Sequence, residues 1–138
     1  MKRILLMMAM VLLATGVHAA DLVWEHDYDK ALAAAKASNK LVLLDMYTDW
    51  CGWCKKLDRD VYTNPDVQEK IAKNFIPLKL NPEKVQKGAE LAGSFGLRGY
   101  PYIAFLKPDG TKLSSIEGYL PADKFGSALD DLTKQAGK

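Results

Sequence analysis

Two short, almost unbroken apolar runs dominate the pattern of this chain. Residues 41–47 and 75–80 are apolar over nearly their whole length, as expected of strands that are covered on both faces. Residues 29–38 are rich in alanine and, together with Tyr28, place apolar side chains on one helical face. The other segments predict, in chain order, an edge strand at 23–26, helices at 52–61, 64–74 and 82–94, strands at 102–106 and 111–117, and a helix at 121–135.

This order of elements predicts an α/β fold in a single domain. Strands that are joined by helices should run parallel, and the last two strands should form an antiparallel hairpin around the turn Lys107-Pro108-Asp109-Gly110. Phe75, Phe105 and Phe125 fall at apolar positions and are expected in the core. We therefore expect a central mixed sheet of about four or five strands, flanked by helices.

Residues 1–19 have the pattern of a cleavable secretory leader. Lys2 and Arg3 precede an apolar run over residues 4–14, and Val17-His18-Ala19 offers small residues at a cleavage site. The run is shorter than the roughly 20 residues that span a membrane, although an uncleaved N-terminal anchor remains an alternative. We expect an exported, periplasmic protein whose mature domain is 20–138.

The charge balance limits the possible partners. The 138-residue chain has 19 Lys and Arg and 17 Asp and Glu, and two of the basic residues belong to the leader. A mature domain with balanced charge argues against nucleic acid and against strong attraction to anionic membranes. We expect a monomer.

The chain has only two cysteines, Cys51 and Cys54. A disulfide across two intervening residues closes almost no loop, so it would stabilise the fold little, whereas the same pair is well suited to redox chemistry. A zinc site would need about four ligands, and the mature chain adds only the distant His26, which we expect at the surface without a catalytic role. A non-catalytic module that binds Cu(I) through the two thiols, or a chaperone, stays open.

Cys51 follows a predicted strand and opens a predicted helix. The free backbone N–H groups and the dipole at a helix N-terminus favour an anion and lower the pKa of a thiol placed there. We therefore expect Cys51 to attack substrate disulfides, and Cys54, one turn later and more buried, to resolve the mixed disulfide.

Two segments resemble the signatures of the thioredoxin superfamily. The stretch from Leu43 to Lys56, with Cys51-Gly52-Trp53-Cys54, resembles the active-site segment, and Phe95 to Pro101 resembles the loop that ends in a cis-proline. The likeness is closest to periplasmic thioredoxin-like domains, including the C-terminal domain of the electron transporter DsbD. It implies a thioredoxin fold and a redox-active disulfide with no further cofactor and no metal.

The resemblance also implies further site residues. Asp45 stands where thioredoxins carry a buried acid, and Lys79 matches the lysine beside that acid. A carboxyl in an apolar strand has its pKa raised by desolvation, so Asp45 could exchange a proton with Cys54, although a purely structural pairing with Lys79 is also open.

Substrate contact is expected around the cysteines. A cis bond before Pro101 would turn the backbone of Tyr100 outward, where a substrate strand could pair with it. The same surface would include Trp50, Gly52 and Trp53, with Trp53 in contact with substrate and Trp50 partly buried.

The sequence departs from ordinary thioredoxin in three places, and the first two of these bear on the redox potential and the choice of partner. The residues between the cysteines are Gly-Trp, Tyr100 and Tyr102 are bulky, and the segment from Asn81 to Gly99 is longer. Because no histidine or cation lies between the cysteines and Asp45 opposes thiolate formation, we expect a reductase of disulfide-containing exported proteins. It would take electrons from a membrane donor of the DsbD type; a thiol oxidase or isomerase is the alternative.

Overall fold

The computed structural model describes residues 21–138, so the predicted leader at 1–19 lies outside the described residues. The described residues form five helices and four strands. In chain order these are α1 (Tyr28–Ser38), β1 (Leu41–Met46), α2 (Gly52–Asp60), α3 (Pro65–Asn74), β2 (Phe75–Leu80), α4 (Gln86–Phe95), β3 (Tyr102–Leu106), β4 (Lys112–Glu117) and α5 (Ala122–Gln135).

The strands form one mixed sheet in the order β2-β1-β3-β4. β1 and β2, which are joined by helices, run parallel, and β3 and β4 form the antiparallel hairpin that the sequence predicts. β1 also pairs with β3 in antiparallel orientation. Central placement explains why every residue of β1 is buried.

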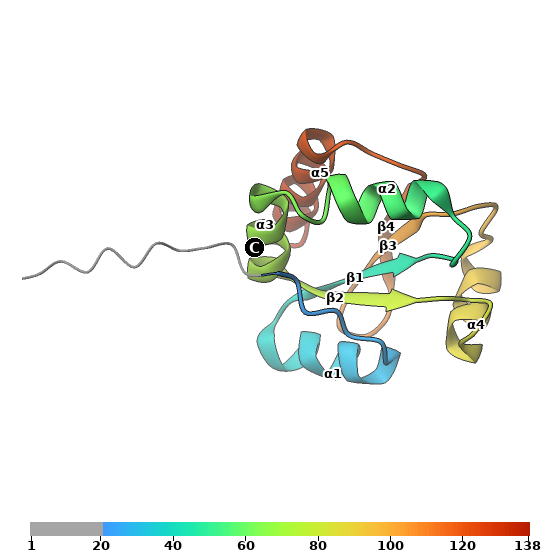
Figure 1. The fold of residues 1–138 in the computed structure, drawn as a ribbon. Coiled ribbons are helices and arrows are strands. Elements are labelled where there is room, and N and C mark those ends of the chain that lie inside the picture. The colour runs from blue at the N-terminus through green and yellow to red at the C-terminus, as the bar shows by residue number, and fades with distance from the viewer. Residues whose placement is uncertain (1–20) are drawn as a thin grey trace, which may run out of the picture.

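Helices cover both faces of the sheet, as Figure 1 shows. Leu41 and Leu43 of β1 pack into a cluster with residues of α2, α3 and α5. Val42 and Leu44 point to the opposite face, into a cluster with residues of α1 and α4. The three phenylalanines expected in the core, Phe75, Phe105 and Phe125, are fully buried. This alternation places Asp45 on the face that α2 covers.

Two predicted elements differ from the structure. The segment 23–26 forms only one isolated bridge, between Glu25 and Leu78 of β2, and not a strand. The helix predicted from Pro82 begins at Gln86, because Asn81 holds the chain in a turn: its carbonyl oxygen accepts the N–H groups of Lys84 and Val85. None of the helices in residues 21–138 is long and apolar enough to cross a membrane.

α3 begins as its sequence predicts. The side-chain oxygen of Asn64 accepts the N–H groups of Asp66 and Val67 at 3.0 and 3.2 Å, and Pro65 occupies the first helical position. Val67 and Ile71 face inward, as expected. This helix returns the chain to the start of β2 and so fixes the parallel pairing with β1.

Candidate active site

The two cysteines lie where the loop after β1 enters α2. Cys51 is the N-cap residue of α2, with an extended backbone, and its Sγ atom is bonded to Sγ of Cys54. The backbone N–H of Cys54 donates to Sγ of Cys51 across 3.1 Å. The first sulfur therefore occupies the place of a capping side chain, at the positive end of the helix dipole.

Burial barely distinguishes the two cysteines. Cys51 is 4% exposed and Cys54 is 3% exposed, so Cys54 is the more buried, as expected, but only by a small margin. The backbone N–H of Cys51 donates to the carbonyl oxygen of Thr48, which closes a turn in the loop before α2. What distinguishes the two sulfurs is position, because only Cys51 caps the helix.

Trp50 lies at the surface and not partly buried, which corrects the expectation from the sequence: the residue is 67% exposed. Its indole N–H donates to Oε1 of Glu83 across 3.0 Å. Its ring meets that of Tyr100 edge to face, with 6.0 Å between centroids. The turn after β2 and the loop before β3 thus hold an exposed indole directly before Cys51.

Trp53 forms a second exposed aromatic surface, and the residue is 59% exposed. Its ring packs against Tyr119 with 5.5 Å between centroids, and the Lys56 ammonium lies over the Tyr119 ring. Gly52, between the two tryptophans in sequence, has open space where a Cβ atom would lie. The backbone next to the disulfide is therefore accessible at this point.

The loop before β3 lies beside the start of α2 because Tyr100 contacts Trp50. The Tyr100–Pro101 peptide bond is cis, and the carbonyl oxygen of Pro101 accepts the N–H of Gly118 across 2.9 Å. Tyr102, although bulky, is buried and stacks on Phe95, so it does not restrict access to the cysteines.

Asp45 and Lys79 face each other across the β1–β2 pair. The Lys79 ammonium lies 2.9 Å from Oδ2 of Asp45 and 2.8 Å from Oδ1 of Asp58 on α2. Asp58 is four residues after Cys54, on the same side of that helix. The ammonium therefore connects the buried acid of β1 with the helix that carries both sulfurs.

Burial and the neighbouring charges together determine the ionisation of this cluster. Burial raises the pKa of Asp45 above its ordinary value, and the charge of Lys79 opposes that rise without cancelling it. Burial also lowers the pKa of Lys79, but the two carboxylates outweigh that effect and the pKa is raised. Burial and the nearby Asp45 carboxylate both raise the pKa of the Tyr62 phenol. Within residues 21–138 its hydroxyl meets no hydrogen-bond partner in good geometry.

Sequence reasoning missed several residues of the site. Asp58 could have been found from its spacing of four residues to Cys54. The remaining residues follow no pattern in the sequence, because tertiary packing brings them to the site. They are Trp24, Tyr47, Tyr62, Glu83 and Tyr119. His26 is exposed, as expected, and its Nδ1 atom lies 3.4 Å from the carbonyl oxygen of Lys79.

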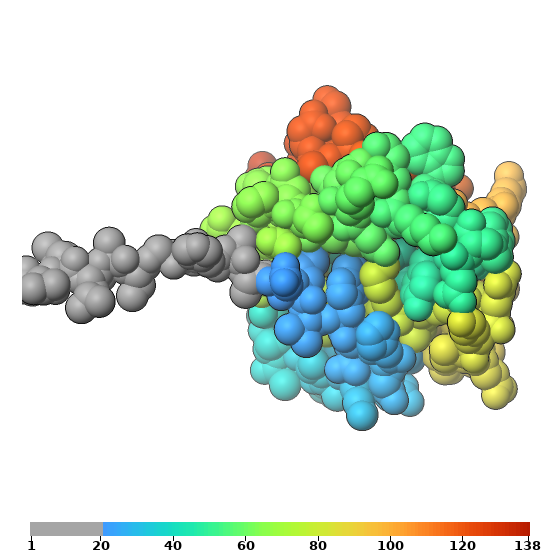
Figure 2. All heavy atoms as spheres, viewed as in Figure 1, coloured from blue at the N-terminus to red at the C-terminus, as the bar shows by residue number. Residues whose placement is uncertain are grey.

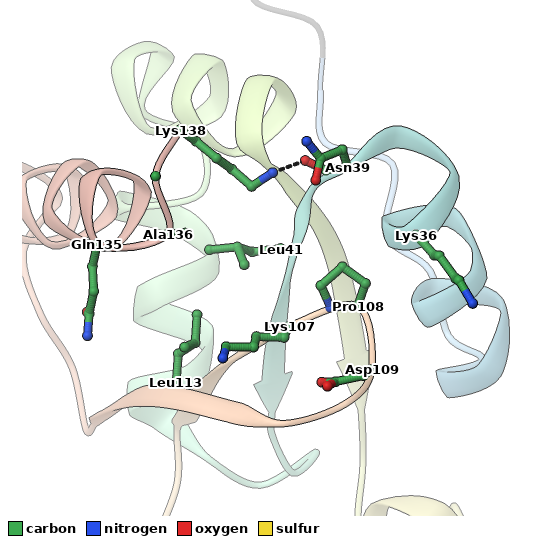
Figure 3. A pocket seen from close by; sticks show the side chains of 11 residues that line it. Lys36, Asn39, Leu41, Lys107, Pro108, Asp109, Leu113, Gln135, Ala136 and Lys138 are labelled. Carbon is green, nitrogen blue, oxygen red and sulfur yellow. Dashed lines mark hydrogen bonds between the residues drawn. The ribbon is translucent and has the colours of Figure 1, made fainter.

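A pocket of about 760 Å³ lies elsewhere, at the amino end of β1. Figure 3 shows the residues that line it, which come from three segments: the end of α1 and start of β1, the hairpin turn with Lys107 to Asp109, and the end of α5. The cysteines follow the opposite end of β1, so this pocket is not part of the disulfide site.

Comparison with known sequences agrees with this geometry. The model of the thioredoxin-like domain family matches residues 28–133. Thiol:disulfide interchange protein DsbD 1 of Pseudomonas aeruginosa is 38% identical over 104 residues, which cover 72% of this chain and 17% of that protein. The thioredoxin-like protein HCF164 of Oryza sativa chloroplasts is 32% identical over 98 residues, which cover 71% of this chain and 34% of that protein. The chain thus spans only a minor part of these relatives.

Comparison with solved structures shows a thioredoxin fold. A thioredoxin from Thermus thermophilus superposes with a TM-score of 0.76 at 24% identity, covering 86% of this chain and 92% of that one. The oxidised C-terminal domain of DsbD from Neisseria meningitidis superposes with a TM-score of 0.66 at 24% identity, covering 79% and 98%. The expected fold, a mixed sheet between helices, is therefore confirmed.

Replacing Asp45 by Asn should stabilise the protein increasingly as the pH rises. The unfolded chain releases the Asp45 proton near its ordinary pKa of 3.8, whereas the folded chain releases it at higher pH. Between these values the folded state binds more protons, so the stability of the wild type falls as the pH rises. Asn cannot ionise and avoids this loss. Urea unfolding at a series of pH values measures the difference.

The matched control is Asp131→Asn, which removes an exposed carboxyl of α5. Both variants exchange one carboxyl for an amide, so a pH-dependent difference between them reports on the buried site of Asp45. A difference between Asp45→Asn and wild type that stays constant from pH 3.5 to about 8 would contradict the inferred rise in the pKa of Asp45.

Proposed function

This chain belongs to the thioredoxin-like family, and from that premise we propose that it reduces the disulfides of exported proteins through Cys51 and Cys54. The observation that carries the proposal is the position of Cys51: its sulfur caps α2, accepts the N–H of Cys54 and is paired with the second sulfur. A thiolate at that place would be stabilised by the first turn of the helix.

The first step is attack on the substrate. The Cys51 thiolate displaces one sulfur of the substrate disulfide, so that a Cys51–substrate disulfide forms and a substrate thiolate leaves. Open space beside Gly52 leaves room for the approaching chain. The leaving thiolate takes a proton from water.

The second step releases the product. The Cys54 thiol gives its proton to Asp45, and the resulting thiolate attacks Sγ of Cys51, which forms the Cys51–Cys54 disulfide and frees the second substrate sulfur as a thiolate. The two electrons of the dithiol pass to the substrate. Asp45 suits this role because burial raises its pKa, and Lys79 holds its carboxylate in place.

Substrate recognition would use the surface around the disulfide. The exposed rings of Trp50 and Trp53 can pack on a substrate chain without requiring a particular sequence. The backbone of Tyr100, next to Trp50, would pair with an extended substrate segment. Main-chain pairing tolerates many sequences, which suits a reductase with varied protein substrates.

The direction of electron flow follows from what stabilises the thiolate. Oxidants of this chemistry stabilise their reduced thiolate strongly, whereas here Gly52 and Trp53 add neither a histidine nor a cation between the cysteines. The buried Asp45 carboxylate opposes a nearby thiolate further. Both features favour donation of electrons over their acceptance.

The electron donor would be a membrane transporter of the DsbD type. The leader-like residues 1–19 support export to the periplasm, where a reductase needs electrons from across the membrane. Similarity to parts of several DsbD proteins supports exchange with such a transporter. The same thiol chemistry would serve both encounters.

Substituting each cysteine separately should give different results in the reduction of insulin by dithiothreitol. Cys51→Ser should lose at least about a hundredfold in catalysed rate, because the attacking sulfur is gone. Cys54→Ser should retain the attack but accumulate a mixed disulfide with substrate, visible as a mass adduct on Cys51. Equal turnover in Cys51→Ser and wild type would refute the proposed enzymatic function. Stoichiometric Cu(I) binding without turnover would favour a metal-binding module.

The equilibrium with glutathione should place the Cys51–Cys54 couple closer to the potential of thioredoxin, about −270 mV, than to that of DsbA, about −120 mV. The physical reason is the weak stabilisation of the thiolate described above. Quantifying reduced and oxidised protein in glutathione buffers gives the value. A potential near that of DsbA would reassign the protein as a thiol oxidase.

A further inference from the structure

The Lys79 side chain is only 12% exposed, although β2 lies at the edge of the sheet. Edge strands are normally open on one side, so another part of the chain must cover this ammonium. The segment before α1 does so. Figure 2 shows this segment, in blue, between the green atoms of α2 and α3 and the cyan atoms of α1, beside β2.

Backbone hydrogen bonds fix this segment against β2 at Lys79 itself. The N–H of Glu25 donates to the carbonyl oxygen of Pro77 across 2.8 Å, and the N–H of Lys79 donates to the carbonyl oxygen of Glu25 across 2.9 Å. Trp24 directly precedes this pairing, and its ring packs edge to face on Tyr62 with 4.8 Å between centroids. The indole is therefore held from two sides.

Three aromatic rings enclose the Lys79 ammonium. Its nitrogen lies 4.9 Å from the ring centroid of Trp24, 4.8 Å from that of Tyr47 and 5.5 Å from that of Tyr62. Each distance is within the range of a cation–π contact. The rings help to keep the Lys79–Asp45 ion pair out of water, since these two side chains are only 12% and 1% exposed.

We propose that Trp24 is a positioning residue for the redox reaction: its indole forms the outer wall of this enclosure and keeps Lys79 and the Asp45 carboxyl in a water-poor site. Trp24 touches neither sulfur and acts through Lys79. The link to catalysis rests on the proposed function, in which Asp45 exchanges a proton with Cys54.

The Trp24 indole affects how far burial raises the pKa of Asp45. Burial is the largest effect on the pKa of that carboxyl, and it exceeds the opposing effect of Lys79. Removing the indole admits water and so weakens the effect of burial, and the pKa of Asp45 should then fall toward its ordinary value. The groups that face this site are Asp45 and Tyr47 from β1 and the loop after it, Lys79 from β2, Asp58 from α2, Tyr62 from the turn after α2, and Trp24 and Glu25 from the segment before α1. Cys54 precedes Asp58 by four residues on α2.

The test is the titration of the Asp45 carboxyl carbon, followed by ¹³C NMR in the reduced full-length protein. Trp24→Leu should lower the titration midpoint by about half a pH unit or more, whereas Trp24→Phe, which keeps a ring, should stay close to wild type. Trp24→Met replaces the Leu variant if the latter does not fold. The acid limb of the pH–rate profile for insulin reduction should move in the same direction.

Tyr28→Leu is the matched control, because Tyr28 is also a partly buried ring with a lysine ammonium over it, on the opposite face of the sheet. It should lower stability without moving the Asp45 midpoint. If Trp24→Leu lowers stability but leaves the midpoint unchanged, or if both variants shift it equally, the role of Trp24 is structural and the proposal is overturned. The titration does not depend on turnover, so failure of this inference and failure of the reductase function are separable.

Discussion

The chemistry of this protein depends on one backbone contact, the N–H of Cys54 directed at the sulfur of Cys51. The contact exists because β1 delivers the chain to the first turn of α2, where N–H groups have no partner within the helix. β1 can do so because it is central and buried, held by β2 on one side and β3 on the other. The sheet therefore serves to hold one sulfur at a helix N-terminus.

Much of the fold could be read from the sequence because its signals are local. The continuous apolar runs predict both β1 and β2, although only β1 is buried throughout and β2, at the edge of the sheet, is partly buried. Asn64-Pro65 marks the start of α3. The segment 23–26 is expected as an edge strand, but in the structure only Glu25 pairs with β2. Pro82 predicts the start of α4 too early. The carbonyl oxygen of Asn81 accepts the N–H groups of Lys84 and Val85 in a turn, and the helix begins only at Gln86.

The residues of the site likewise fall into those that the sequence indicates and those that only tertiary packing brings together. The spacing of Cys51 and Cys54 at a predicted helix start indicated a redox pair, and the resemblance to thioredoxins implied that Asp45 lies beside Lys79; the structure has both pairs. The exposure of Trp50 and the enclosure of Lys79 could not be predicted this way. Each depends on segments that are distant in sequence, Glu83 after β2 in one case and the chain before α1 in the other. Such contacts leave no periodicity in the chain.

The most direct measurement is the rate at which iodoacetamide alkylates Cys51 in the reduced protein as a function of pH, with the modified residue identified by mass spectrometry. If α2 stabilises the thiolate, the midpoint of the rate profile lies clearly below about 8.5, the pKa of free cysteine, and returns to that value when the protein is unfolded in guanidinium. A midpoint at or above the value of the unfolded chain would contradict the account.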